Sequence, residues 1–177
     1  MSWSIDTVHT HVGFAVKHMM VTTVRGQFRS YRATLLKLDP KDFTKSRFEG
    51  EIDVASVDTG NPDRDNHLRT SDFFDAPNHP TITFKSTRVE VESKDRLTVF
   101  GDLTVRGTTR EVPLETEIHG VGKNPYGKEV VGFTCETSIN RKEWGLNWNV
   151  ALEQGGWLVG DRLKITVEGQ AAKEEQG

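Results

Sequence analysis

The sequence has one cysteine, Cys135, in 177 residues. A single cysteine excludes a disulfide within the chain, and such a chain is typical of a reducing compartment. No apolar stretch approaches the roughly 20 residues that a membrane-spanning helix needs. The first residues lack the basic segment and the apolar segment of about 7–15 residues that mark a signal peptide. We therefore expect a cytoplasmic protein, or a periplasmic one if a leader has been removed.

An excess of positive charge is also missing. The formal net charge is −3, and lysine and arginine are scattered along the chain instead of gathered in runs. A nucleic-acid surface or an anionic membrane attracts a concentrated basic patch. The composition therefore predicts neither of these as a partner.

Catalytic and metal-binding motifs are missing as well. The chain contains no nucleophile elbow, phosphate loop, zinc-ligand spacing or dinucleotide fingerprint. His9 and His11 share one side of an expected strand, but no third metal ligand stands near them in sequence. The five aspartates between residues 58 and 75 are explained by a solvated helix, and Cys135 has no partner that would activate it. We predict no catalytic residue, no metal and no cofactor.

What the sequence does contain is alternation of apolar and polar residues. In RFEGEIDVAS, Phe48 and Ile52 fall on one face and Glu49 and Glu51 on the other. The segments TVFGDLTVRG and RLKITVEG repeat the pattern, and five further segments show it less regularly. Period-two alternation predicts about eight antiparallel strands with one face in water. Strands in this number avoid exposed edges most completely by closing into a barrel, so we expect an all-β barrel in one domain, 1–177.

One segment, NPDRDNHLRTSDFF at residues 61–74, departs from this pattern. Asn61 is a suitable N-cap, Pro62 suits the first helical position, and Asp63 and Asp65 would interact favourably with the helix dipole. The segment predicts one short helix around residues 62–72.

Glycines interrupt the apolar face of the expected strands. Gly50 is in phase with Phe48 and Ile52, and the same holds for Gly26, Gly101, Gly120 and Gly169 in their own strands. These glycines either mark bulges where strands turn a barrel corner, or thin the inner face so that a ligand supplies the missing volume. An eight-stranded barrel has room for one small ligand, and a tunnel along strands of about 45 Å suits an extended lipid. The residues alone leave both explanations open.

Four segments together resemble one family. WSIDTVHTHVGFAVKHM, ASVDTGNPDRDNHLRTSDFFDAPNHPTITFKS, GDLTVRGTTREV and NRKEWGL are similar to the YceI family of lipocalin-like, polyisoprenoid-binding proteins, and the resemblance covers residues 3–170. It implies an extended eight-stranded antiparallel lipocalin-like barrel, often dimeric, whose apolar tunnel holds a long isoprenoid or a similar amphiphile. It carries over no catalytic residue.

We therefore predict a non-enzymatic protein that binds a long-chain polyisoprenoid lipid, of isoprenoid quinone or polyprenol type, for transport, storage or sequestration, and that forms a homodimer. Alternation assigns the tunnel wall to Phe14, Val16, Phe28, Phe48, Ile52, Phe84, Leu103, Val105 and Phe133. His18 is the candidate contact for a polar head group. The predicted helix would cap the barrel, with Phe73 and Phe74 packed on the sheet and Arg64, Asp65 and Arg69 tied to neighbouring loops.

Two other functions fit the same residues. One is an enzyme that acts on such a lipid, with His18 or the region of Asp72 as its acid–base group. The other is a packed barrel that holds no ligand and binds a protein partner. For Arg141 and Trp144, a structural corner is favoured over a substrate clamp.

Overall fold

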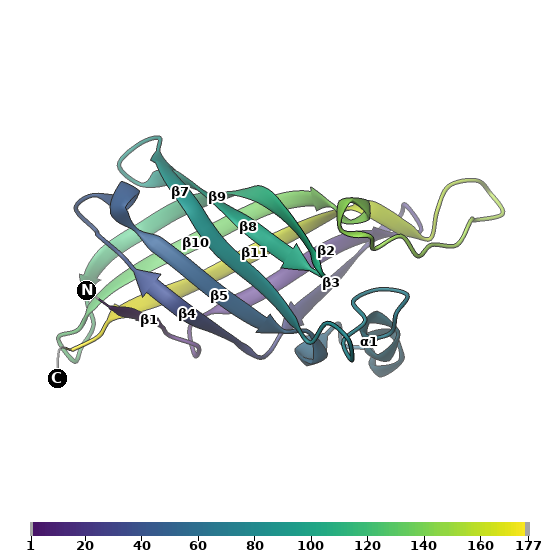
Figure 1. Ribbon diagram of the computed structural model, residues 1–177, viewed down its shortest axis with the longest axis horizontal. Coiled ribbons are helices and arrows are strands. Elements are labelled where there is room, and N and C mark those ends of the chain that lie inside the picture. The colour runs from purple at the N-terminus through teal and green to yellow at the C-terminus, as the bar shows by residue number, and fades with distance from the viewer. Residues whose placement is uncertain (1, 176–177) are drawn as a thin grey trace.

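The computed structural model describes residues 2–175 and consists mainly of antiparallel β-strands (Figure 1). The strands are β1 (Trp3–Ile5), β2 (His11–His18), β3 (Thr22–Phe28), β4 (Tyr31–Lys37), β5 (Arg47–Asp53), β6 (Val57–Asp58), β7 (Thr81–Val91), β8 (Arg96–Val105), β9 (Thr108–Lys123), β10 (Glu129–Asn140) and β11 (Val159–Lys173). The helices are α1 (Pro62–Arg69) and three 3-10 helices, η1 (Phe43–Lys45), η2 (Val54–Ser56) and η3 (Arg141–Trp144). None of the helices in residues 2–175 is long and apolar enough to span a membrane.

The strands form one strongly curled sheet. Its order is β4-β5-β7-β8-β9-β10-β11-β2-β3-β6, and β1 pairs with β11 outside this path. Figure 1 shows the result as an elongated half-barrel, with the strands running diagonally and with α1 and η3 at the end away from the termini. Every ladder is antiparallel, which lets one face of each strand turn inward and the other face water.

The two sides of the curled sheet meet along a seam, which we define as the line between β4 and the segment from Ser2 to Thr10, which includes β1. An isolated bridge pairs Ser2, the residue before β1, with Lys37 of β4 there. Side chains hold the rest of the seam: the Trp3 indole N–H donates to the Leu38 carbonyl at 3.1 Å, and the Tyr31 hydroxyl donates to the Thr10 carbonyl at 2.6 Å. These bonds close the half-barrel where the ladder does not.

All eight predicted strands are present, and the predicted fold class is confirmed. The prediction missed three strands: the short β1 and β6, and the seven-residue β4. In β4 a register shift between Ala33 and Leu35 inserts an extra residue, so that Leu36 is buried and the alternation of the sequence is broken. A pattern of period two cannot reveal a strand that contains such a bulge near its centre.

Helix α1 begins as predicted and ends earlier. The Asn61 side chain accepts a hydrogen bond from the Arg64 amide, and Pro62 is the first helical residue. The helix ends at Arg69 instead of continuing to residue 72, because Thr70 has an extended backbone and the chain turns back toward the sheet. Phe73 and Phe74, which follow this turn, are buried as expected.

The polar ties of α1 are also confirmed. Arg69 donates to the carbonyls of Ala55 and Val57, while Arg64 donates to the Thr59 hydroxyl and carbonyl. Asp65, buried in spite of its charge, accepts from the Thr59 amide at 2.8 Å. These bonds fix α1 as a cap beside the barrel.

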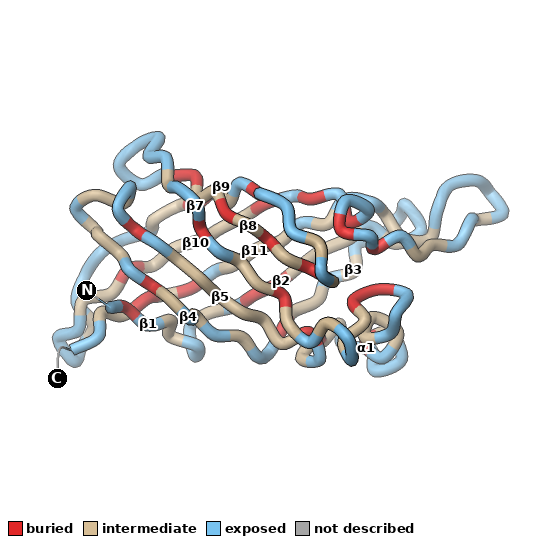
Figure 2. Tube along the Cα trace, viewed as in Figure 1, coloured by how far each residue is buried: buried red, intermediate tan, exposed pale blue. Residues whose placement is uncertain are grey.

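The buried inward side chains form two clusters, toward opposite ends of the barrel. Figure 2 shows the buried positions spread along the strands. The end near α1, which we call the packed half, has a dense core made of Val12, Phe28, Val54, Val57, Phe74, Ile82, Leu103, Val105, Val112, Ile139, Trp144 and Leu146. The buried cluster at the end near the termini has only four members, Trp3, Leu36, Val131 and Ala171. The end with the smaller core is the one that contains the cavity described next.

Candidate ligand-binding cavity

A cavity of about 210 Å³ lies inside the curled sheet, toward the end near the termini. We call this end the hollow half. Strands β1, β2, β4, β5, β7, β8, β9, β10 and β11 all contribute lining residues, and most of these are apolar. For comparison, an engineered apolar cavity of about 150 Å³ stays dry and binds benzene. The cavity therefore has the size and the character of a site for an apolar ligand.

The glycines of the inner face explain how the lumen stays open. The Phe84 ring lies over Gly101, so that a Cβ atom on this glycine would be 2.3 Å from the ring. The Phe48 ring lies over Gly50 in the same way, at 2.8 Å. Because each ring occupies the space of a missing side chain, it lies against the wall instead of across the lumen. The glycines thus thin the inner face, as one of the two explanations proposed.

The other explanation, that glycines mark bulges where strands turn a corner, holds at some of the same positions. Gly50 lies opposite the bulge of β4, Gly101 lies opposite a register shift between Ser86 and Arg88, and Gly120 lies at a shift beside Gly132. Bulges increase the bend and twist of a strand, which a curled sheet requires. Gly50 and Gly101 therefore mark corners of the barrel and also receive aromatic rings, whereas Gly120 lies at a register shift with no atom over it.

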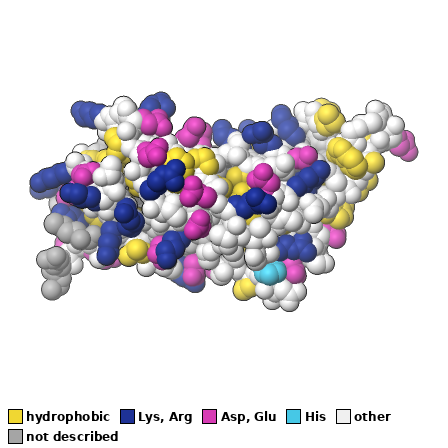
Figure 3. All heavy atoms as spheres, turned by 45° about the horizontal axis from the view of Figure 1, so that its top comes forward, with side chains coloured by type: hydrophobic (Ala, Val, Ile, Leu, Met, Phe, Trp, Pro, Cys, Tyr) yellow, Lys and Arg dark blue, Asp and Glu magenta, His cyan; other side chains and the backbone are white. Residues whose placement is uncertain are grey.

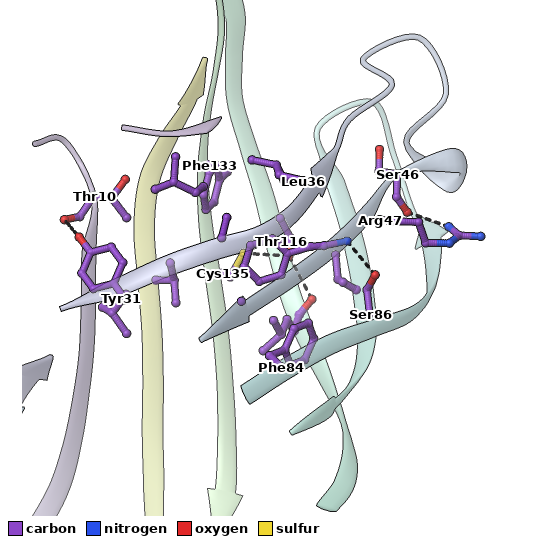
Figure 4. A pocket seen from close by; sticks show the side chains of 18 of the residues that line it. Thr10, Tyr31, Leu36, Ser46, Arg47, Phe84, Ser86, Thr116, Phe133 and Cys135 are labelled. Atoms are coloured by element: carbon purple, nitrogen blue, oxygen red, sulfur yellow. Dashed lines mark hydrogen bonds between the residues drawn. The ribbon is translucent and has the colours of Figure 1, made fainter. Parts of the chain in front are cut away.

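Most polar atoms in the cavity wall are already engaged with the backbone (Figure 4). The Ser86 hydroxyl accepts a hydrogen bond from the Phe48 amide at 2.9 Å, and the Ser46 hydroxyl accepts one from the Asp39 amide at 3.1 Å. Tyr31 is tied to Thr10 across the seam, and burial raises the pKa of its phenol. These groups build the wall and have little capacity left for a ligand.

Three further polar groups lie on neighbouring inward positions of β9 and β10. They are Thr116, Cys135 and Thr137, and all three line the cavity. The Thr116 hydroxyl donates to the Leu114 carbonyl at 3.1 Å and lies 3.3 Å from the Cys135 sulfur. Burial raises the pKa of the Cys135 thiol to about 11, so the thiol stays protonated at neutral pH and is a poor nucleophile.

The outer face of the same strands is charged. Figure 3 shows basic and acidic side chains interspersed over the barrel surface. Cross-strand pairs include Lys85 with Glu49 at 3.6 Å and Lys164 with Glu136 at 3.7 Å. Such exposed pairs contribute little stability, but they mark this face as the one in water.

Five of the ten predicted ligand-binding residues line the cavity: Phe48, Ile52, Phe84, Leu103 and Phe133. The other five lie outside it, toward or within the packed half: Phe14, Val16, His18, Phe28 and Val105. Phe14 lies over Gly26 and packs against Phe28 at 5.5 Å between ring centroids. Contact between any of the ten and a ligand stays a prediction.

Sequence reasoning did not select several lining residues, among them Tyr31, Leu36, Leu114, Thr116, Cys135 and Thr137. The residues on β9 and β10 could have been found, because they continue the phase of Ile118 and Phe133. Tyr31 and Leu36 gave no signal because the bulge of β4 hides their phase.

The other candidate sites have structural explanations. Within residues 2–175, no group of three or more His, Cys, Asp or Glu side chains is placed to hold a metal ion. His9 instead contacts the Asp6 carboxylate at 2.7 Å, and this hydrogen bond lowers the pKa of Asp6. Asp72 contacts His67 at 2.8 Å beside α1, away from the cavity lining.

Arg141 and Trp144 form a buried corner. The Arg141 guanidinium, only 3% exposed, donates to the carbonyls of Leu146 at 2.5 Å, Gly160 at 2.9 Å and Trp148 at 3.0 Å. Burial lowers the pKa of this group, while Asp161 opposes the shift. The contacts are those of a structural corner.

Fold and cavity together define a class of protein: a curled antiparallel β-barrel with an apolar internal site and a charged exterior. A model of the YceI-like domain matches residues 3–171, so the chain belongs to the YceI family, and the resemblance found in the sequence is confirmed. The UPF0312 protein SERP2314 of Staphylococcus epidermidis is 38% identical over 164 residues, which are 92% of each chain. UPF0312 protein SAUSA300_2620 of Staphylococcus aureus is 36% identical over 175 residues, 98% of this chain and 99% of that one.

Solved structures share the fold. The YceI protein of Campylobacter jejuni is 32% identical with a TM-score of 0.77, covering 97% of both chains. BcnA of Burkholderia cenocepacia is 24% identical with a TM-score of 0.80, covering 96% of this chain and 99% of its own. A polyisoprenoid binding domain from Saccharophagus degradans is 11% identical with a TM-score of 0.72, covering 98% of this chain and 99% of its own.

Proposed function

We propose that this protein binds a long-chain polyisoprenoid or a similar amphiphilic lipid in the cavity of the hollow half, for transport, storage or sequestration. The observation that carries the proposal is the apolar cavity itself, about 210 Å³ in volume and walled by Phe48, Phe84 and Phe133. Membership of a family whose fold is shared by a polyisoprenoid binding domain supports the same ligand class.

The physics of such a site is simple. Burying apolar surface gains roughly 25 cal/mol per Å², so a hydrocarbon chain needs no specific polar contact to bind. A cavity of about 210 Å³ holds only a segment of a long chain in the present conformation. The rest of the chain lies outside this volume unless the phenylalanine rings move. We therefore expect affinity to rise with chain length only until the cavity is filled.

A binding protein fits the site better than the two alternatives. A barrel packed throughout would not leave a cavity among its inward residues. For an enzyme, His18 and Asp72 both lie outside the cavity lining, and the Cys135 thiol inside it stays protonated at neutral pH. The chemistry of such an enzyme would have to take place away from this apolar cavity.

The proposal is tested by filling the cavity. Cys135→Phe places a ring inside the lumen, while Ser138→Phe places the same ring on the exposed face of the same strand. Native mass spectrometry of protein mixed with a polyprenol should show one lipid per chain for the wild type and for Ser138→Phe. We expect at least a tenfold weaker complex for Cys135→Phe, since the ring and the lipid compete for one volume. Equal binding by all three proteins would show that the lipid binds at another part of the molecule, which would contradict the proposal.

The cytoplasmic location and the homodimer stay predictions. Light scattering on the purified protein measures its mass in solution. We expect the mass of two chains; the mass of one chain, 19.9 kDa, would contradict the dimer.

A further inference from the structure

The inner end of the cavity carries a polar feature that a purely apolar ligand would not use. Thr137 lies on the inward side of β10, in phase with Phe133 and Cys135, and is 9% exposed. Its hydroxyl makes no hydrogen bond within residues 2–175, whereas the neighbouring Thr116 hydroxyl donates to a carbonyl. No enclosed side-chain oxygen in these residues lacks a partner, so the Thr137 oxygen keeps accessible surface at the cavity wall. It is therefore free to donate a hydrogen bond to a ligand and to accept one from it.

Thr137 also marks the inner boundary of the cavity. The next inward residue of β10, Ile139, belongs to the core of the packed half, as do the cavity-lining residues Leu103 and Val112. A ligand that fills the hollow half therefore ends at Thr137. Whatever group it carries at that end lies close to this hydroxyl, with Thr116 and Cys135 beside it.

The lumen has no charge to match an ionised group. The charged residues that touch the cavity are Arg32, Glu51 and Arg47. Arg32 and Glu51 pair with each other, and Arg32 remains 58% exposed. Arg47 donates to the carbonyls of Thr44 and Ser46, and Figure 4 shows it directed away from Cys135. An ionised head group buried at Thr137 would lose its hydration with no compensating charge.

We propose that the ligand enters with its polar end first and that this end is a neutral hydrogen-bonding group, such as an alcohol, a phenol or an amide, held by the Thr137 hydroxyl. The inference rests on the proposed function, which it sharpens from lipids in general to uncharged amphiphiles. It assigns Thr137 the role of distinguishing an isoprenoid alcohol from the hydrocarbon of the same length.

The test compares three probes that share one C15 isoprenoid chain: farnesol, farnesene and farnesoic acid. Dissociation constants are measured for the wild type and for Thr137→Val, which keeps the shape of the side chain and removes the hydroxyl. We expect the wild type to prefer the alcohol over the hydrocarbon, and this preference to fall about fivefold in Thr137→Val, the usual effect of one hydrogen bond. The carboxylate should bind at least tenfold more weakly than the alcohol.

Two controls separate recognition from stability. Thr166→Val makes the same change on the outward face of the adjacent strand β11, and its preference should equal that of the wild type. Thr137→Ser keeps a hydroxyl at the same place, and it should keep the preference for the alcohol even if both affinities fall. This rescue would not occur if Thr137 served only to pack the wall.

The outcomes distinguish this inference from the proposed function. If the wild type binds the alcohol and the hydrocarbon equally well, and Thr137→Val does the same, the lipid site stands but the role of Thr137 is overturned. Tight binding of the carboxylate would likewise overturn the neutral head group. No binding of any probe or of longer polyprenols to the wild type would overturn both proposals together.

Discussion

The two halves of the barrel are built from the same strands but differ in what enters them from outside the sheet. The packed half receives Phe74 from the turn after α1, and Trp144 and Leu146 from the corner at η3. The four members of the buried cluster in the hollow half, Trp3, Leu36, Val131 and Ala171, all belong to strands, as does the buried cavity-lining residue Leu97. A curled sheet thus leaves a lumen by default, and connecting segments decide which end of it is filled.

Glycine–aromatic pairs occur in both halves and do not account for this difference. Phe14 lies over Gly26 in the packed half, as Phe48 lies over Gly50 in the hollow half. What differs is the other side of each ring: Phe14 contacts Phe28, which contacts Phe74, whereas Phe48 faces the cavity. Substitutions in the two halves should therefore have different energetic effects.

The largest effect is expected for Trp144→Ala. Trp144 is 2% exposed, and its indole N–H donates to the Leu103 carbonyl at 3.1 Å, so its removal leaves a cavity and loses this hydrogen bond. We expect the free energy of unfolding to fall by about 3–5 kcal/mol. Urea denaturation of Trp144→Ala and of Phe84→Ala measures the loss of unfolding free energy in each half.

Phe84→Ala should cost at least about 1 kcal/mol less than Trp144→Ala, because Phe84 already has one side on a cavity. Equal losses from the two substitutions would mean that the hollow half is as tightly packed as the other, and that the distinction between the halves is wrong.

A smaller effect is expected from a matched pair of glycine substitutions. In Gly26→Ala the new methyl group would lie 2.3 Å from the Phe14 ring, and in Gly50→Ala 2.8 Å from the Phe48 ring. Phe14 packs against Phe28 and does not line the cavity, so we expect Gly26→Ala to destabilise the fold by about 1–3 kcal/mol. The Phe48 ring can move into the lumen, so Gly50→Ala should cost less than about 1 kcal/mol and weaken lipid binding instead.

Both properties are read from the same samples, by urea denaturation and by native mass spectrometry with a polyprenol. A Gly50→Ala variant that loses stability but binds lipid normally would show that the Phe48 ring does not move into the ligand volume.

The sequence predicted the architecture better than the site, for a physical reason. Alternation identifies the face of a strand, so all eight expected strands are present and Phe48, Phe84 and Phe133 line the lumen. Alternation does not say how far along the barrel an inward residue lies, nor what covers it. Phe28 and Val105 are inward too, but Phe74 and Trp144 reach them from distant connections. Such contacts depend on loop paths, which period-two patterns do not encode.

The smallest effect concerns the thiol of the hollow half. Burial raises the pKa of Cys135 to about 11, above the usual value of 9.0. Between pH 7 and pH 10 we therefore expect its reaction with iodoacetamide to be slow and to rise about tenfold per pH unit, since the thiolate is the reacting form. In protein unfolded in urea, the reaction rate should level off near pH 9. Mass spectrometry follows the alkylation of both the folded and the unfolded protein.

The same shift gives a dependence of stability on pH. Because the folded state holds the proton more tightly, the contribution of Cys135 is fully present below pH 9 and is lost as the pH rises toward 11. Cys135→Ser should lack this loss while otherwise keeping the pH profile of the wild type. A reaction rate that levels off near pH 9 in the folded protein would show that water reaches the thiol freely, and that burial does not raise its pKa.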